Sequence, residues 1–220
     1  FRMVRQNLSL GFPSLIAQLS SGIVMITFNA IILSLEGNTG VAAYGVVANI
    51  SLVIVAVYTG ISQGVQPLIS NYYGTGDREH IRRVLRYAMV TTAVISCLIY
   101  AVVYFFADPV AGVFNSEGNL RLQQIAVDGL KLYFTSNLFV GFNIVIAIFF
   151  TSTEKTIPAH VLSLLRGLVL IVPLSFLLSA VWGMTGVWLT YPLTELSVAV
   201  LGCLIYLKSQ GFCGADKKKY

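Results

Sequence analysis

The sequence predicts an all-α membrane protein, a bundle of six transmembrane helices, and three observations support this prediction. Of the 220 residues, 56% are hydrophobic and only 10% are charged, whereas a soluble domain carries about 25% charged residues. The mean hydropathy is +0.81. Apolar stretches of about 20 residues recur along the chain, which is the length that a helix needs to cross the hydrocarbon core of a bilayer.

Short connections join the six stretches, so we expect one transmembrane lobe over residues 1–220. Pro13 stands in the first turn of the first stretch, where its missing N–H does no harm. Asp108 and Pro109 are expected to end the third stretch, because the residue before a proline disfavours helix. The expected spans are residues 11–35, 41–73, 84–107, 120–150, 157–180 and 183–207, followed by a polar tail at 208–220.

Lysine and arginine gather on one side of this expected bundle. Arg2 and Arg5 precede the first span, four arginines follow the second, Lys155 follows the fourth, and a lysine-rich tail follows the sixth. Because basic loops stay in the cytoplasm, we expect both termini on the cytoplasmic side of the plasma (inner) membrane. The chain begins with Phe1, so we expect it to be a fragment of a longer protein.

A polar stripe runs down the first span. Its members, at steps of three and four residues, are Ser14, Gln18, Ser21, Met25 and Asn29. This spacing places them on one face of a helix. Such a stripe serves either helix–helix packing or the lining of a cavity. The length of the stripe favours a cavity lining.

The second span carries Gln63 and Gln66 just before Pro67. A proline inside a helix removes a backbone hydrogen bond and bends the helix. In lipid, the freed groups need neighbouring helices or a water-filled cavity. The two glutamines therefore line a cavity or, alternatively, bind only to other helices beside a kink. We expect Pro173 and Pro192 to bend the fifth and sixth spans in the same way.

Charged and amide side chains lie deep in the last three spans. Asn137 and Asn143 lie in the apolar part of the fourth, and Arg166 and Glu195 lie about halfway along the fifth and sixth. A charge at a helix centre costs roughly 2.5–3.5 kcal/mol on insertion scales, so such charges pair or face water. Because sequential spans are antiparallel neighbours, we expect Arg166 to approach Glu195. The pair is either functional, as part of a cation-accepting cavity or a protonation switch at Glu195, or structural, fixing the register of two helices.

Several classes of function find no support in the sequence. His80 and His160 are far apart and the three cysteines are unclustered, so we expect no metal site and no disulfide framework. We find no nucleophile–base arrangement and no phosphate-binding glycine loop, so we expect no enzyme and no cofactor. The net charge of +5 comes from residues between apolar spans, which indicates membrane topology and not nucleic-acid binding.

Four segments carry a resemblance to a known family. They are Gly11-Phe-Pro13, the stretch from Gly60 through Gln66-Pro67 to Gly74, Arg166, and the stretch from Gly183 to Pro192. In these segments the chain resembles the multidrug and toxic-compound extrusion (MATE) transporters. The resemblance is to the C-terminal six-helix half of the twelve-helix fold and covers about residues 8–207.

This resemblance implies a cation-coupled antiporter, driven by protons or sodium, that exports organic cations and other amphipathic compounds by alternating access between two lobes. It implies a second six-helix lobe as partner, besides membrane lipid and the small substrates. Some members place a glutamate after the opening Gly-x-Pro and an aspartate in the fourth helix of this half. Here the first region reads Gln18-Leu-Ser20, and the second offers Asn137 and Asn143. Coupling then falls to an acid in the other half or to Glu195.

Two other functions stay open at this point. A lipid-linked oligosaccharide flippase of the same superfamily would favour a more cationic cavity, and the pairing of Arg166 with a glutamate argues against it. A membrane scaffold without transport would have its intramembrane polar groups saturated by helix contacts and would have no water-accessible cavity.

Overall fold

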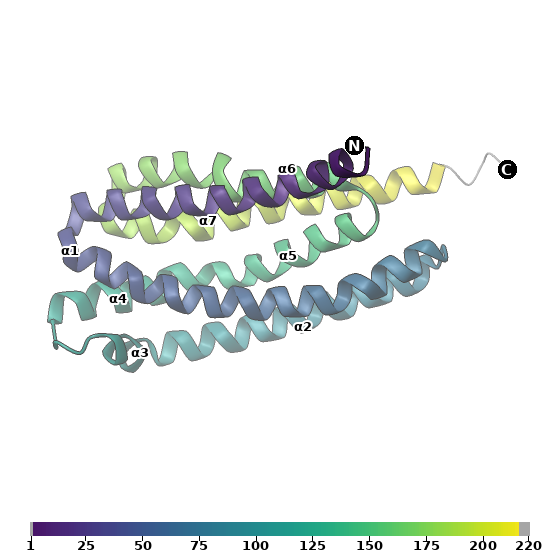
Figure 1. Ribbon diagram of the computed structural model, residues 1–220. Helices are drawn as coiled ribbons and strands as arrows, with labels where there is room; N and C mark the ends of the chain where they lie inside the picture. Colours follow the sequence, from purple (N-terminus) through teal and green to yellow (C-terminus); the bar gives the residue numbers. More distant parts are fainter. Residues whose placement is uncertain (1, 216–220) are drawn as a thin grey trace.

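The computed structural model describes the backbone of residues 2–215 and the side chains of residues 20–155 and 157–208. The described chain is helical almost throughout. Its elements are α1 (Arg2–Gly74), α2 (Arg78–Phe105), α3 (Ala107–Phe114), α4 (Leu120–Tyr133), the 3₁₀ turn η1 (Phe134–Ser136), α5 (Asn137–Ser152), α6 (Thr156–Leu164), the π-helix η2 (Leu165–Val169) and α7 (Ile171–Ala215). Figure 1 shows the long helices side by side in one elongated bundle.

Two of these helices contain one residue with non-helical backbone angles. Gly37 in α1 has φ 63° and ψ −154°, and Gly183 in α7 has φ 57° and ψ −133°. Positive φ costs glycine little because it has no Cβ. The chain reverses direction at both glycines (Figure 1). Phe28 accordingly stacks on Tyr44, with ring centroids 5.6 Å apart. On a straight helix, two residues that are 16 positions apart would be separated by about 24 Å.

The described residues contain four helical segments that are long and apolar enough to cross a membrane, where the sequence predicts six. Two of the four are unusually long, Ser20–Gly74 with 55 residues and Ile157–Lys208 with 52. A span needs about 20 residues. The counts differ because two expected connections are each reduced to a single non-helical residue. The loop expected at residues 36–40 becomes a reversal at Gly37, and the connection expected before residue 183 becomes a reversal at Gly183. The helices before and after each glycine are therefore counted as one segment.

The region around Asp108 and Pro109 also differs from the prediction. Helix was expected to end there, but the break lies earlier, at Phe106 (φ −106°, ψ 18°). α3 then begins at Ala107 and contains both residues in its first turn. Proline is tolerated there because the first N–H groups of a helix have no intrahelical acceptor.

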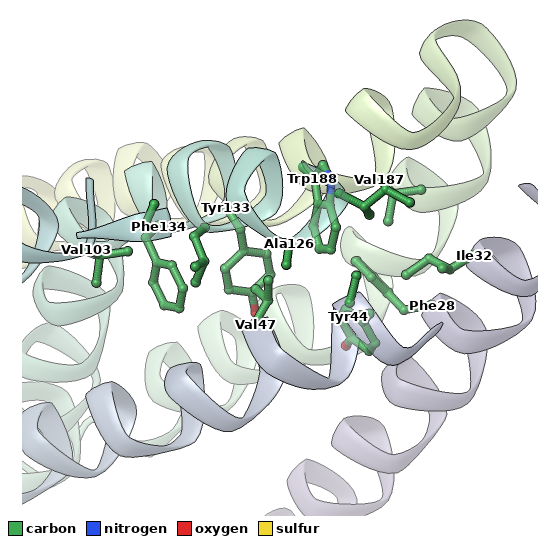
Figure 2. Close-up of a cluster of buried hydrophobic side chains, with 14 of the residues drawn as sticks. Phe28, Ile32, Tyr44, Val47, Val103, Ala126, Tyr133, Phe134, Val187 and Trp188 are labelled. Atoms are coloured by element: carbon green, nitrogen blue, oxygen red, sulfur yellow. The ribbon is translucent and has the colours of Figure 1, made fainter. Parts of the chain in front are cut away.

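Aromatic side chains fill the core between the helices. Figure 2 shows Tyr44 of α1, Tyr133 of α4 and Trp188 of α7 within one buried cluster. Trp188 packs so closely on α4 that a Cβ at Gly129 would lie 2.7 Å from its Cζ2 atom. The outer surface is apolar as well; Leu98, for example, is 61% exposed. Soluble proteins rarely expose large apolar patches, so this surface indicates a multi-pass membrane protein.

Candidate functional site

Arg166 and Glu195 form an ion pair inside the bundle, as the sequence predicts. The Nε atom of Arg166 donates to Oε1 of Glu195 over 2.5 Å. The Glu195 side chain is 0% exposed and that of Arg166 is 23% exposed. The prediction that these two residues approach each other is confirmed.

The Arg166 end of the pair stands on irregular helix. η2 makes the wider π-type bond, in which the N–H of Leu170 donates to the carbonyl of Leu165 over 3.0 Å. π-helices are rare and occur often at functional sites. Glu195 stands on α7, three residues after Pro192, which lies inside that helix and has no N–H to donate. Arg166 therefore stands on a departure from regular α-helix, and Glu195 stands within the turn that follows a proline.

Asn143 of α5 completes the polar centre. Its Nδ2 atom donates to Oε2 of Glu195 over 2.7 Å and to the backbone carbonyl of Glu195 over 2.9 Å. Both carboxylate oxygens thus accept a hydrogen bond from a nitrogen donor. We use the name polar centre for Asn143, Arg166 and Glu195 from here on.

Tyr191 joins the polar centre to the aromatic core cluster. Tyr191 lies beside both Arg166 and Glu195. Its ring stacks on Tyr133 with centroids 4.6 Å apart and an interplanar angle of 6°. Tyr44 and Trp188 continue the aromatic packing, with centroids 6.3 Å apart. Tyrosine suits this boundary because its ring is apolar and its hydroxyl is polar.

The polar centre is neutral overall, which determines what it can do chemically. A buried ion pair is costly to dehydrate and persists when hydrogen bonds satisfy both charges. Removing either charge leaves the other unpaired in a medium of low dielectric constant. The centre can therefore respond strongly to a proton on Glu195, because Arg166 would then lose its counter-charge.

Asn137 also lies on α5 but faces a different part of the bundle. It is buried, and its backbone carbonyl accepts from Ser96 of α2 over 3.1 Å. The Ser96 hydroxyl also lies 2.9 Å from the Tyr58 hydroxyl of α1. The Nδ2 atom of Asn137 has no hydrogen-bond partner among the described side chains. The structure therefore brings Asn143, and not Asn137, to the ion pair.

The remaining predicted site residues lie outside the polar centre. Gln63 is exposed, and Asn29 and Gln66 are half-buried. The side chain of Gln18 lies outside the described residues. α1 continues as helix through Pro67, its non-helical residue being Gly37, and Pro173 is the third residue of α7. Whether these two prolines bend their helices stays a prediction.

A second ion pair, which the sequence analysis missed, lies at the end of the bundle where α1 reverses. Arg121 of α4 binds both carboxylate oxygens of Glu36, at 2.6 and 2.8 Å from Nη2. Close by, Nε2 of Gln123 donates to Oδ1 of Asp108 over 2.8 Å. Glu36 and Arg121 are 85 residues apart, so nothing in their spacing indicates the contact.

Comparisons with known proteins agree on a transporter fold. The family model MatE matches residues 13–177. The multidrug export protein MepA of Staphylococcus saprophyticus is 24% identical over 195 residues, covering 89% of this chain and 42% of that protein. The FAD transporter of Shewanella oneidensis is 26% identical over 188 residues, covering 84% and 40%. The chain thus spans less than half the length of these relatives.

Solved structures match over nearly the whole chain. The inward-facing conformation of a multidrug resistance MATE family transporter of the MOP superfamily superposes with a TM-score of 0.88 at 21% identity, covering 100% of this chain and 50% of the other. A MOP superfamily transporter from Pyrococcus furiosus superposes with a TM-score of 0.84 at 20% identity, covering 99% and 48%. At these identities the match shows the fold, which is half of a MATE fold.

Proposed function

The chain belongs to the MatE family, and on that premise we propose that it is one lobe of a cation-coupled exporter of organic cations and other amphipathic compounds. The observation that carries the proposal is the polar centre, an acid fully buried in a membrane bundle and bound to a single arginine. Intramembrane ionisable groups are costly and serve in proton relays and substrate pathways of transporters.

The proposed lobe crosses the membrane six times. The reversals at Gly37 and Gly183 divide α1 and α7 into two halves each. Each half of α1 and the second half of α7 is long enough for one crossing, and α6, η2 and the 12 residues of α7 before Gly183 together supply a fourth. α2 and the α4–α5 pair supply the other two. A second lobe of similar size completes the transporter, since the chain covers about half of the matching structures. Alternating access then opens a path between the lobes to either side.

The proposed orientation has both termini in the cytoplasm. α1 begins and α7 ends at the same end of the bundle (Figure 1). The start of α2, with its four arginines, lies at that end too. Basic segments are retained on the cytoplasmic side.

Glu195 is the proposed coupling acid, with a proton in preference to sodium as the coupling ion. Hard cations take oxygen ligands, whereas both oxygens of Glu195 accept from nitrogen atoms of Arg166 and Asn143. A proton needs no such ligands. Once Glu195 is neutral, Arg166 loses its counter-charge. A conformation in which water solvates Arg166 then becomes more stable than the conformation in which Arg166 is buried. This difference between two states couples proton binding to movement.

The amides predicted from the sequence line the proposed substrate path. These are Gln18, Asn29, Gln63, Gln66, Asn137 and Asn143, with helix bending at Pro67, Pro173 and Pro192. Because Glu195 neutralises Arg166, the membrane-embedded part described here offers no excess positive charge at its centre. A path of that character fits cationic and amphipathic compounds better than a nucleotide carrying phosphates, such as FAD.

Efflux measurements test this proposal. We expect cells that express the complete transporter to export a fluorescent organic cation when a proton gradient is applied. Glu195→Gln should abolish gradient-driven efflux while the protein still reaches the membrane. Glu117→Gln, a matched change of an exposed acid in a loop, should leave efflux unchanged. Normal efflux by Glu195→Gln would remove Glu195 from the mechanism, and absence of efflux by the wild type would refute the exporter.

Labelling of single cysteines tests the substrate path independently of transport. In a background with Cys97, Cys203 and Cys213 replaced by serine, Gln66→Cys should react with a water-soluble maleimide in membranes. Leu98→Cys, exposed on the outer face of α2, should not react because lipid covers it. Equal lack of labelling at Asn29, Gln63 and Gln66 would instead favour a scaffold without a water-accessible cavity.

A further inference from the structure

A row of arginines lies at the start of α2. Arg78, Arg82 and Arg86 follow one another at four-residue intervals, so they share one side of the helix, with Cβ atoms about 6 Å apart. All three side chains are exposed. Like charges four residues apart destabilise a helix, so the row favours an anion that lies between its members.

The segment keeps a positive excess even after its own acids are counted. It contains the four arginines Arg78, Arg82, Arg83 and Arg86, and two carboxylates. Glu79 accepts from Nη2 of Arg83 over 3.0 Å. Asp77 binds the backbone N–H of His80 over 3.1 Å and its Nδ1 atom over 2.6 Å. Four arginines against two carboxylates leave the segment with an excess of positive charge.

An exposed apolar track continues the face of Arg86 into the membrane. Val90, Ala93 and Cys97 are all exposed, and at 100° per residue they lie within about 40° of Arg86 around the helix axis. The rise from Arg86 to Cys97 is about 16 Å. This is close to half of the roughly 30 Å hydrocarbon thickness, which is the depth of one leaflet.

We propose that Arg82 and Arg86 bind the phosphate of an anionic phospholipid whose acyl chain lies along Val90, Ala93 and Cys97. Positive side chains at a membrane boundary attract anionic headgroups, and the smooth apolar track below gives the acyl chain a surface to pack on. A soluble anion has no use for such a track. The site favours a lipid because the two arginines and the apolar track lie on the same face of one helix.

The test uses the full chain reconstituted in bilayers of phosphatidylethanolamine with and without phosphatidylglycerol. Lipids that stay bound after extraction into detergent are counted by native mass spectrometry. We expect wild type to retain phosphatidylglycerol in preference to phosphatidylethanolamine. The double variant Arg82→Gln/Arg86→Gln should bind phosphatidylglycerol about 30-fold more weakly, with unchanged elution volume and helix content.

Matched variants separate the site from general charge. Arg121→Gln removes one arginine at the opposite end of the bundle, where it binds Glu36, and should leave retention unchanged. Arg82→Lys/Arg86→Lys keeps both charges and should stay within a few-fold of wild type. Raising the salt concentration shortens the Debye length from about 10 Å at 0.1 M to about 3 Å at 1 M, and should weaken retention by wild type more than by the double variant.

Three results would overturn the proposal. One is equal retention of phosphatidylglycerol by wild type and the Arg82→Gln/Arg86→Gln variant. Another is no preference of wild type for phosphatidylglycerol over phosphatidylethanolamine. The third is displacement of phosphatidylglycerol by millimolar inorganic phosphate, which would assign the arginines to a soluble anion and not to lipid. None of these results depends on whether the chain transports a substrate.

Discussion

Two of the arginine–glutamate pairs in the described part of the chain join distant segments and have the same chemistry in different surroundings. Arg166 and Glu195 meet inside the bundle, where Glu195 is 0% exposed. Arg121 and Glu36 meet at its end, where Arg121 is 57% and Glu36 20% exposed. The exposed pair has the better geometry, with two carboxylate oxygens bound by one guanidinium.

The difference between the pairs shows that surroundings, and not contact geometry, decide what an ion pair does. An exposed pair contributes at most about 1 kcal/mol, because water solvates either partner alone. Breaking a buried pair costs about 3–5 kcal/mol, because one charge stays behind without solvent. Of these two pairs, the buried one is therefore expected to give the larger change in free energy when one charge is removed.

The largest expected loss of stability comes from removing only one residue of the buried ion pair. Arg166→Met leaves the buried Glu195 without its counter-charge, beside Asn143 and Tyr191, so we expect the protein to lose about 3–5 kcal/mol of stability. Denaturant unfolding in detergent micelles measures the loss. Arg166→Met/Glu195→Leu removes both charges and should recover most of it. An unchanged unfolding midpoint for Arg166→Met would show that the pair is already hydrated.

Packing around the buried region should be nearly as sensitive. A Cβ at Gly141 of α5 would overlap Cγ2 of Thr92 and lie 3.1 Å from Cε1 of Tyr58. We expect Gly141→Ala to cost about 1–3 kcal/mol, which is typical of overpacking. Gly60→Ala is the matched control, because no atom lies within 4 Å of a Cβ there. The same unfolding assay compares them, and equal effects would show that α5 can move away from α1 and α2.

Breaking the exposed pair should have a smaller effect. Glu36→Gln leaves Arg121 at the surface, so we expect a loss below about 1 kcal/mol. The loss should shrink further in high salt, because exposed charges are screened. Unfolding measurements at low and high salt concentration check this expectation. A loss as large as that of Arg166→Met would mean that the end of the bundle is shielded from water.

The smallest expected effect is pH-dependent and lies between α1 and α2. The backbone N–H of His80 donates to Asp77 and lowers the pKa of this carboxyl below its usual value. Because the lowered pKa belongs to the folded state, Asp77 contributes stability above the unfolded pKa of about 3.9, and this contribution is lost as the pH falls through the folded pKa. Asp77→Asn keeps a capping oxygen but removes the charge.

Unfolding of wild type and Asp77→Asn at several pH values measures this contribution. We expect wild type to be the more stable protein at pH 7 and the difference to shrink as the pH falls below about 4, through the lowered pKa of Asp77 in the folded state. A difference that does not change with pH would assign the role of Asp77 to the hydrogen bond alone.

The sequence predicts the helical membrane fold and the buried pair for a clear physical reason. Arg166 and Glu195 are costly charges in neighbouring spans, and each needs a partner. The sequence does not indicate the π-helix at residues 165–169, because no residue pattern distinguishes it from regular helix. It does not indicate the contact of Glu36 with Arg121, because water solvates both residues in any arrangement. Gly37 was expected in a short connection and Gly183 at the start of the sixth span, but the reversals at both glycines depend on the packing of helices on either side.

Proton release on substrate binding tests the central claim most directly. Adding an organic cation to the purified complete transporter in weakly buffered detergent solution should release protons, which a pH-sensitive dye detects, because the substrate favours the state with Glu195 ionised. We predict that Glu195→Gln still binds the cation but releases none. Equal proton release by wild type and Glu195→Gln would contradict the account, since the coupling acid would then lie elsewhere.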